Sequence, residues 1–298
     1  MSGSPRTRRP PAVAGTFYPD RPEELERIIG HSFSDSRIGP GANPPATEKS
    51  KVYGMVSPHA GYVYSGAVAA HGFYKVSSSN FQDVVMVGPN HYGIGSGVAM
   101  MAEGTWETPL GEVRINSQLA RKIASRSAKM DISDTAHIRD HCLEVQIPFL
   151  QSIKKEFEIV PIVLIMQDID TAFDLGKAIA ETISENGHDD DDINKNNSGS
   201  DNTLLIASSD LTHYETNSEA HRKDGELIKA MLALDVYKFY AVLERLDVSA
   251  CGYGAIAAIM VAAKSLGATR GELLRYATSG DVTGDTSAVV GYSSVVFV

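Results

Sequence analysis

Cysteine and long apolar stretches are both scarce in this sequence, and each scarcity excludes a class of protein. The 298 residues hold two cysteines, Cys142 and Cys251, where a disulfide scaffold would carry more, so we expect a cytoplasmic protein. A single Cys142–Cys251 bridge stays open as an alternative. The longest apolar run, Ala250–Ala263, is too short and too interrupted by glycine to cross a bilayer, which takes about 20 residues. We therefore expect a buried helix there and no membrane partner.

An excess of basic charge is also missing, because the formal net charge is −10. Binders of duplex nucleic acid usually present a basic patch, so we expect no nucleic-acid partner. Arg6, Arg8 and Arg9 do cluster, but they lie in a proline-rich start of the chain. We interpret residues 1–10 as a flexible, solvated tail rather than a nucleic-acid arm. No apolar run follows these arginines, so we expect no secretory signal.

Apolar runs alternate with helical patterns along the chain, which is typical of an α/β fold and, without repeats, of one domain over residues 1–298. The expected strands are Val52–Val56, Val84–Val87, Ile159–Ile165, Leu204–Ala207 and Ser287–Val296. The expected helices are Ser65–Lys75, Gln118–Ser127, Leu143–Lys154, Thr171–Ser184, Ser218–Leu232 and Cys251–Ser265. Continuous apolar strands fit burial on both faces, so we expect a central, mostly parallel or mixed sheet with helices on both sides.

Two connecting segments carry expectations of their own. Gly97–Met101 and Glu112–Ile115 flank the turn-rich Glu103–Gly111, which predicts an antiparallel hairpin between two α/β units. Residues 186–202 are polar and acidic and include four consecutive aspartates. We interpret them as a solvated surface loop, with a cation site as the alternative.

Three of the expected strands end in polar residues that suit a shared site. His59 follows the first strand, His91 the second, and Asp210 with His213 the fourth. The carboxyl ends of parallel strands share one edge of a sheet, where ligand sites form, so we expect these side chains to meet in one cleft. Imidazoles and carboxylates are usual ligands of iron, zinc and copper, and an open position beside them lets a metal bind substrate or water. The alternative for any one histidine is a surface or packing role.

Further candidates lie near the other segment ends. Cys251 opens the last expected helix, and the partial positive charge of a helix N-terminus lowers the pKa of a thiol. A thiolate there could ligate a metal or act as a nucleophile, and the alternative is a small buried residue. His141 and Glu144 lie three residues apart and share a helix face. We expect them to orient a metal-bound imidazole, with a helix cap as the alternative. Four tyrosines either line the cleft or pack the loops: Tyr62, Tyr64, Tyr92 and Tyr214.

With these residues in view, the chain resembles the Memo family. The matching pieces occur in family order and span nearly the whole chain. They are PAVAGTFYP at Pro11–Pro19, SPHAGYVYSG at Ser57–Gly66, VGPNHYG at Val87–Gly93, TPLGEV at Thr108–Val113, HCLEVQIPFL at His141–Leu150, SSDLTHY at Ser208–Tyr214 and CGYGAI at Cys251–Ile256. The C-terminal TSGDVTGDTSAVVGY resembles archaeal and bacterial members more than animal ones.

The resemblance implies a fold similar to that of the class III extradiol ring-cleaving dioxygenases, which bind non-heme Fe(II). By resemblance, His59 and His91 take the two histidine positions, and Cys251 falls where those enzymes have a carboxylate. His213 resembles their acid/base histidine, with Asp210 beside it. A thiolate favours softer ions such as Cu(I) and makes a centre prone to oxidation. We therefore expect iron or copper, with zinc as an alternative, and do not carry ring cleavage over.

Three functions follow as hypotheses. The first is a metal-dependent redox enzyme acting on a small molecule. The second is a non-catalytic module that binds a peptide or a phosphate-bearing ligand in the same cleft, as the resemblance to animal members implies. The third is a thiol hydrolase with Cys251 as nucleophile and His213 with Asp210 as base and orienter. Resemblance to microbial members also implies AMMECR-type and radical-chemistry proteins as partners.

Overall fold

Four parallel strands form the centre of a mixed, twelve-stranded sheet in a computed structural model of the chain, which describes residues 7–47, 51–186 and 202–298. The main path of the sheet runs β1-β5-β6-β8-β3-β9-β2-β12-β10, with β11 added on β12, β4 added on β8, and β7 added on β4. The strands are β1 (Arg8–Arg9), β2 (Gly54–Ser57), β3 (Asp83–Pro89), β4 (Val98–Met100), β5 (Thr105–Thr108), β6 (Gly111–Ile115), β7 (Met130–Ile132), β8 (Glu158–Leu164), β9 (Thr203–Ser208), β10 (His213–Glu215), β11 (Gly271–Thr278) and β12 (Val289–Phe297).

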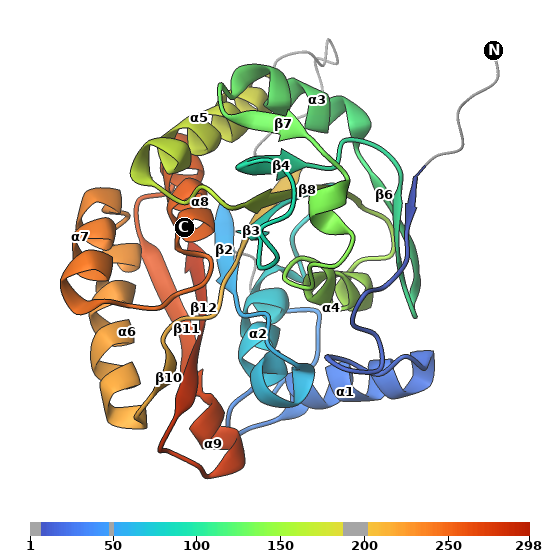
Figure 1. Ribbon diagram of the computed structural model, residues 1–298. Helices are drawn as coiled ribbons and strands as arrows, with labels where there is room; N and C mark the ends of the chain where they lie inside the picture. The colour runs from blue at the N-terminus through green and yellow to red at the C-terminus, as the bar shows by residue number, and fades with distance from the viewer. Residues whose placement is uncertain (1–6, 48–50, 187–201) are drawn as a thin grey trace.

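Helices cover both faces of this sheet (Figure 1). The helices are α1 (Pro22–Ser34), α2 (Tyr62–Val76), α3 (Ser117–Arg126), α4 (Ile147–Ile153), α5 (Ile169–Asn186), α6 (Asn217–Leu232), α7 (Val236–Leu246), α8 (Tyr253–Ser265) and α9 (Ser279–Thr283), with short 3-10 turns at Thr135–His137 and Glu144–Gln146. Helix α8 packs on β2, β3 and β9 and is itself covered by α5, while α2 packs on β2 and β12 and is covered by α1 and α4. The expected single α/β domain with a mixed sheet is confirmed.

The central strands are buried along their whole length, which explains why they read as continuous apolar runs. In β3 every residue after Asp83 is buried, and in β9 all six residues are. Strands β8, β3, β9 and β2 are parallel neighbours in that order. Parallel strands with helices on both faces have no solvated side and hence no polar alternation. Their carboxyl ends therefore lie at one common edge.

The expected hairpin is wrong in one of its two strands. The strand β4 pairs antiparallel with β8 and parallel with β7, not with β6. The antiparallel partner of β6 is β5, and a tight turn at Pro109 and Leu110 joins the two, while β6 pairs parallel with β8 on its other side. Thr108 Oγ1 accepts the Leu110 N–H at 3.0 Å, and Gly111 closes the turn with a φ of +121°. A positive φ favours glycine, so this turn, rather than the apolar run before it, sets the hairpin.

The start of the chain corrects a second expectation. Residues 1–6 lie outside the described part, but Arg8 and Arg9 form β1, which pairs parallel with β5. Arg9 is only 3% exposed, so the solvated tail does not extend through this residue. The acidic segment expected at 186–202 falls almost entirely outside the described residues.

Three smaller findings complete the comparison with the sequence. Both cysteines are free thiols. The segment expected to be helical from Leu143 is a 3-10 turn followed by α4, with Pro148 in its first turn. Within the described ranges, none of the helices combines the length and the apolar character that crossing a membrane requires.

Candidate metal centre

The three residues expected to ligate a metal converge at the carboxyl edge of the parallel strands. His59 follows β2, His91 follows β3, and Cys251 lies two residues before α8. One donor atom from each of the three lies within 4.8 Å of the other two. The two imidazole rings are 5.2 Å apart between centroids and nearly perpendicular. Residues separated by up to 192 positions in the sequence thus face one small volume.

A buried hydroxyl fixes the orientation and tautomer of His59. Ser208 Oγ donates to the carbonyl oxygen of Cys142 at 2.6 Å and accepts from Gln146 Nε2 at 2.8 Å. Its single proton is thus used, so at 3.0 Å it accepts a hydrogen bond from Nδ1 of His59. The Nε2 atom of His59 therefore carries the lone pair, and it lies 3.1 Å from Cys251 Sγ. Burial and the nearby His91 lower the pKa of His59 well below its usual value, so the ring is neutral.

The carboxylate of Asp140 fixes the orientation of His91. The backbone N–H of His91 donates to Asp140 Oδ2 at 2.7 Å, and its Nδ1 donates to Asp140 Oδ1 at 3.1 Å. Nε2 of His91 is therefore the ring nitrogen that Asp140 does not use. Asp140 is 2% exposed and also accepts the Cys142 N–H at 3.0 Å. Although burial alone would raise it, the hydrogen bonds from His91 and Cys142 bring the pKa of Asp140 below its usual value. A carboxylate on the second nitrogen of a histidine is the arrangement that orients metal-binding imidazoles.

The two residues expected to orient an imidazole behave differently from each other. His141 lies inside the cluster, stacked on His91 at 4.6 Å between ring centroids and 5.4 Å from the His59 ring. Burial and the neighbouring histidines lower the pKa of His141 to about 4. Glu144 points away: its carboxylate accepts from Arg9, from the N–H groups of residues 12 and 13, and from Tyr18. The prediction that Glu144 orients a metal-binding imidazole is thus wrong. Asp140 is the carboxylate that orients His91.

Cys251 is placed as expected, but its electrostatics differ from the expectation. Besides His59, its sulfur contacts the Asp210 N–H at 3.3 Å. Burial, followed by the charge of Asp210, raises the pKa of this thiol well above its usual value. The predicted lowering by the helix N-terminus is therefore wrong for the protein without a bound cation. The reason is that the sulfur is desolvated beside a carboxylate.

Asp210 and His213 lie beside the cluster. Within the residues that the structure describes, no hydrogen bond joins the two, and each has other partners. Asp210 Oδ1 accepts the backbone N–H of His59 at 2.8 Å, so this carboxylate holds the loop that carries His59. His213 is oriented instead by Ser249, whose hydroxyl accepts the His213 N–H at 2.8 Å and whose carbonyl accepts from Nδ1 at 2.9 Å. A carbonyl oxygen only accepts, so Nδ1 carries the proton and Nε2 of His213 is the basic nitrogen.

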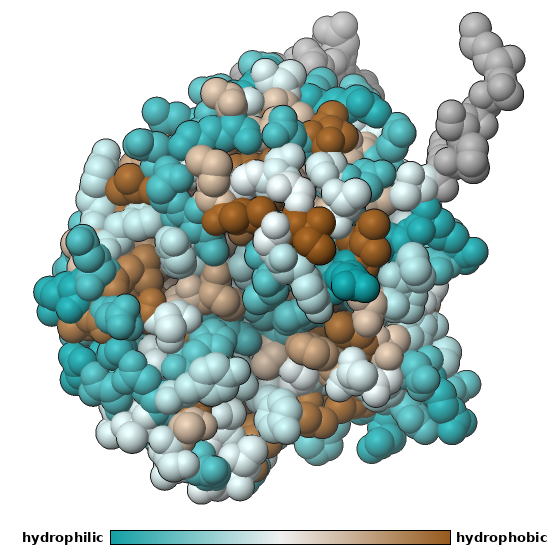
Figure 2. All heavy atoms as spheres, viewed as in Figure 1, coloured by the Kyte–Doolittle hydropathy of each residue, from teal (hydrophilic) through white to brown (hydrophobic). Residues whose placement is uncertain are grey.

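Aromatic and apolar side chains surround the cluster. Tyr62 is buried and donates to the Val145 carbonyl at 2.6 Å, so it packs the loops. The other three expected tyrosines are exposed: Tyr64 at 44%, Tyr92 at 50% and Tyr214 at 80%. Large apolar residues at the start of α2 and in the loops between elements are exposed as well, namely Val63, Ile94, Ile138, Ile165 and Met166. Figure 2 shows hydrophobic residues in a row across the middle of the face it displays.

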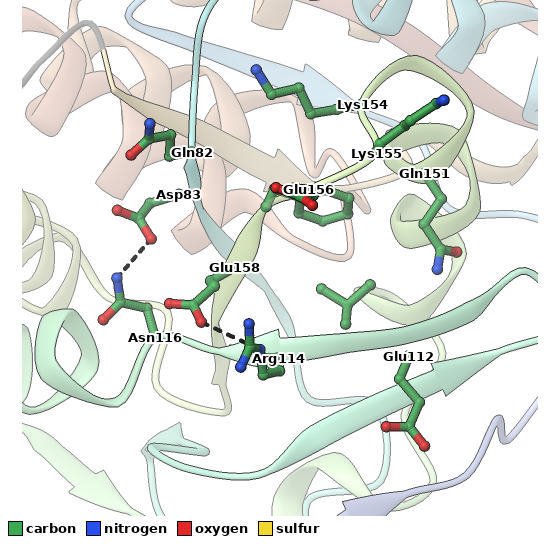
Figure 3. Close-up of a pocket in the computed structure, with 12 residues that line it drawn as sticks. Gln82, Asp83, Glu112, Arg114, Asn116, Gln151, Lys154, Lys155, Glu156 and Glu158 are labelled. Atoms are coloured by element: carbon green, nitrogen blue, oxygen red, sulfur yellow. Dashed lines mark hydrogen bonds and ion pairs between the residues drawn. The ribbon is translucent and has the colours of Figure 1, made fainter.

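A separate cleft of about 890 Å³ lies at the opposite, amino edge of the sheet, where β3, β6 and β8 meet (Figure 3). Its walls carry Lys154, Lys155 and Arg114 together with several carboxylates. Two of its polar pairs are internal: Asn116 donates to Asp83, and Arg114 pairs with Glu158 at 3.7 Å. None of the histidines, cysteines, carboxylates or tyrosines proposed from the sequence for the site lines this cleft.

Fold and cluster together define an α/β protein with a two-histidine, one-cysteine donor set at its strand ends. Comparisons with known proteins agree: the family model described as Memo-like protein matches residues 9–296. The chain is 48% identical to a MEMO1 family protein of Nitrosopumilus maritimus, over 97% of this chain and 99% of that relative. It is 43% identical to one of Thermotoga maritima, again over 97% and 99%. The chain belongs to the Memo family, as its motifs predicted.

Proposed function

We propose that this chain holds one transition-metal ion between Nε2 of His59, Nε2 of His91 and Sγ of Cys251, and uses it in redox chemistry on a small molecule. The observation that carries the proposal is the convergence of one donor atom from each of the three residues within 4.8 Å of the other two. Each histidine is fixed through its other nitrogen, by Ser208 or by Asp140. Such support is what pre-orients a metal site before the ion arrives.

The donor set fits iron or copper, and zinc as an alternative. Bonds of about 2.0–2.3 Å to one ion place tetrahedral donors roughly 3.4–3.8 Å apart. The present separations, 3.1 Å between His59 and Cys251 and at most 4.8 Å within the set, need only small side-chain adjustments. Each histidine has one nitrogen that is not used by its supporting hydrogen bond, and the thiol would lose its proton on binding. A bound ion would supply Lewis acidity and, for iron or copper, electron transfer to a substrate at its open position.

His213 is the residue we propose for proton transfer. Its ring is half-buried at the edge of the cluster, with Nδ1 anchored on the Ser249 carbonyl. The opposite nitrogen is therefore free to take a proton from a bound small molecule and return it later. Asp210 supports this region indirectly, because it fixes the backbone of His59 and lies against Cys251.

The test is elemental analysis of protein purified anaerobically under reducing conditions. We expect roughly one ion per chain in the wild type and most of it lost in His91→Ala and Cys251→Ser. The matched control is His221→Ala, because His221 is an exposed histidine outside the cluster whose ring contacts the ring of Tyr276. Equal metal content in all four proteins contradicts the proposed ligands. Oxygen uptake with catechols, compared between wild type and Cys251→Ser, then tests redox turnover.

A second function, binding without catalysis, is supported by the exposed aromatic and apolar residues around the cluster. Such a surface could receive a peptide or a phosphate-bearing ligand, alone or as part of a complex with AMMECR-type or radical-chemistry partners. Calorimetry with phosphotyrosine distinguishes the two functions. Binding that His59→Ala abolishes, in a protein with no turnover, favours this second function. The thiol hydrolase loses support, because Cys251 contacts His59 rather than His213 and its thiol is held protonated.

A further inference from the structure

Arg9 is buried, whereas the side chain of its neighbour in β1, Arg8, is largely exposed. Its guanidinium stacks over the Trp106 ring at 4.1 Å, and it is 3% exposed. Three of its nitrogens reach three different acceptors at the same distance of 2.7 Å. These are the carbonyl of His137 from Nε, the carbonyl of Asp140 from Nη2 and Glu144 Oε2 from Nη1. All three acceptors lie in one loop.

That loop carries the groups that hold His91. Its Asp140 carboxylate accepts both the N–H and the Nδ1–H of His91. Its His141 stacks on the His91 ring from one side and contacts Phe17 at 4.4 Å between ring centroids. Through Glu144, which also accepts from Tyr18, Arg9 ties this loop to the segment that bears Phe17. A continuous set of contacts therefore runs from Arg9 through Asp140 to His91.

We propose that Arg9 is a positioning residue for the metal site: it fixes the backbone of Asp140 so that the Asp140 carboxylate aims Nε2 of His91 at the ion. This inference rests on the metal-binding function proposed above and adds the residue that pre-orients one ligand. Only a planar guanidinium can serve three acceptors in fixed directions. A lysine at position 9 keeps the positive charge beside Glu144 but cannot reach both carbonyls in the same way.

The experiment titrates full-length apoprotein with Co²⁺ under reducing, anaerobic conditions and follows thiolate-to-metal absorption. The variants are Arg9→Lys, Asp140→Asn and the double variant. The matched control is Arg8→Lys, the neighbouring residue of β1, whose side chain is 63% exposed and pairs with Glu107 and Glu112. Because residues behind a metal ligand change affinity about 10–100-fold, we expect Arg9→Lys to weaken Co²⁺ binding about tenfold. Arg8→Lys should stay within about twofold of the wild type.

Two readouts separate positioning from simple loss of structure. Thermal unfolding of each apoprotein measures its stability. Comparing the Co²⁺ affinity of the double variant with that of each single variant tests whether Arg9 acts through Asp140. If Arg9 acts through Asp140, the double variant should bind Co²⁺ about as weakly as Asp140→Asn alone, because coupled sites are not additive.

Several outcomes overturn the inference, and they differ from failure of the proposed function. If the Arg9→Lys variant unfolds at a lower temperature but binds Co²⁺ as tightly as the wild type, Arg9 has a structural role only. Additive losses in the double variant would show that Arg9 does not act through Asp140. If the wild type itself binds no Co²⁺, the metal site is wrong and the inference fails with it.

Discussion

Replacing Ser208 with alanine should damage both the stability of the fold and the candidate metal site. The side chain is fully buried, and its hydroxyl is the common partner of the Cys142 carbonyl, Gln146 Nε2 and His59 Nδ1. Without it, the Nδ1–H of His59 and the Cys142 carbonyl lose partners where water is excluded. Each buried group left unsatisfied costs about 1–3 kcal/mol, so we expect the free energy of unfolding to fall by about 2–6 kcal/mol.

The same substitution frees the His59 ring to rotate or change tautomer, so metal affinity should fall about 10–100-fold. The assays are thermal unfolding of the apoprotein and metal titration by calorimetry. Ser294→Ala is the matched control, because Ser294 is equally buried and its hydroxyl has no recorded hydrogen-bond partner in the described structure. Ser208→Ala that matches Ser294→Ala in both assays would refute the hydrogen-bond reasoning.

Three further predictions follow from the same structure. His137 is buried, and desolvation followed by the positive charge of Arg9 lowers its pKa to about 3. The unfolded chain therefore binds one more proton than the folded chain between about pH 6.5 and 3, and stability should drop as the pH falls through that window. His137→Leu should flatten this dependence in urea unfolding measured at pH 4, 5 and 7, and an unchanged slope counts against it. Gly252→Ala should destabilise the fold by about 1–3 kcal/mol and weaken metal binding, because a Cβ there would lie 2.5 Å from the Ser208 carbonyl oxygen. In contrast, Gly225→Ala should stabilise α6 by about 0.5–1 kcal/mol, because a Cβ at that position meets open space. Chemical denaturation of both variants checks the contrast. His213→Gln should keep its metal but lose redox turnover, so retained turnover with normal metal content would remove His213 from proton transfer.

The sequence was sufficient to predict the cluster because its members follow a simple rule. His59 and His91 come directly after continuous apolar runs, and parallel strands bring such positions to one edge. Cys251 lies just before the first residue of α8, and His213 follows the end of β9, so both were also expected at this edge. The strand boundaries themselves shifted by a few residues without moving these side chains away from the edge.

The residues that hold the ligands could not be predicted in this way. Asp140 lies in a loop without regular periodicity, and only the folded chain shows that its carboxylate reaches His91. Glu144, by contrast, looked suitable because it lies three residues after His141. The 3-10 turn begins only at Glu144, so His141 lies outside it and the two residues do not share a helix face. Arg9 was interpreted as solvated because an arginine among prolines gives no sign of burial.

Several described elements were not predicted from the sequence, among them α1, α7 and β11, although part of the signal for the two helices was present. Helix α1 buries Leu25, Ile29 and Phe33, which recur every four residues, and α7 buries a similar apolar stripe. Strand β11 is harder to predict, because its middle residues are only partly buried and a bulge interrupts its pairing with β12. Long-range pairing with β12, rather than local pattern, places this strand in the sheet.

X-ray absorption at the zinc edge of zinc-loaded protein tests most directly whether two imidazoles and a sulfur hold one ion. We expect one sulfur at about 2.3 Å and two imidazole nitrogens at about 2.0–2.1 Å, with the sulfur contribution absent in Cys251→Ser. A coordination sphere without sulfur in the wild type, or one unchanged by that substitution, would contradict the proposed site.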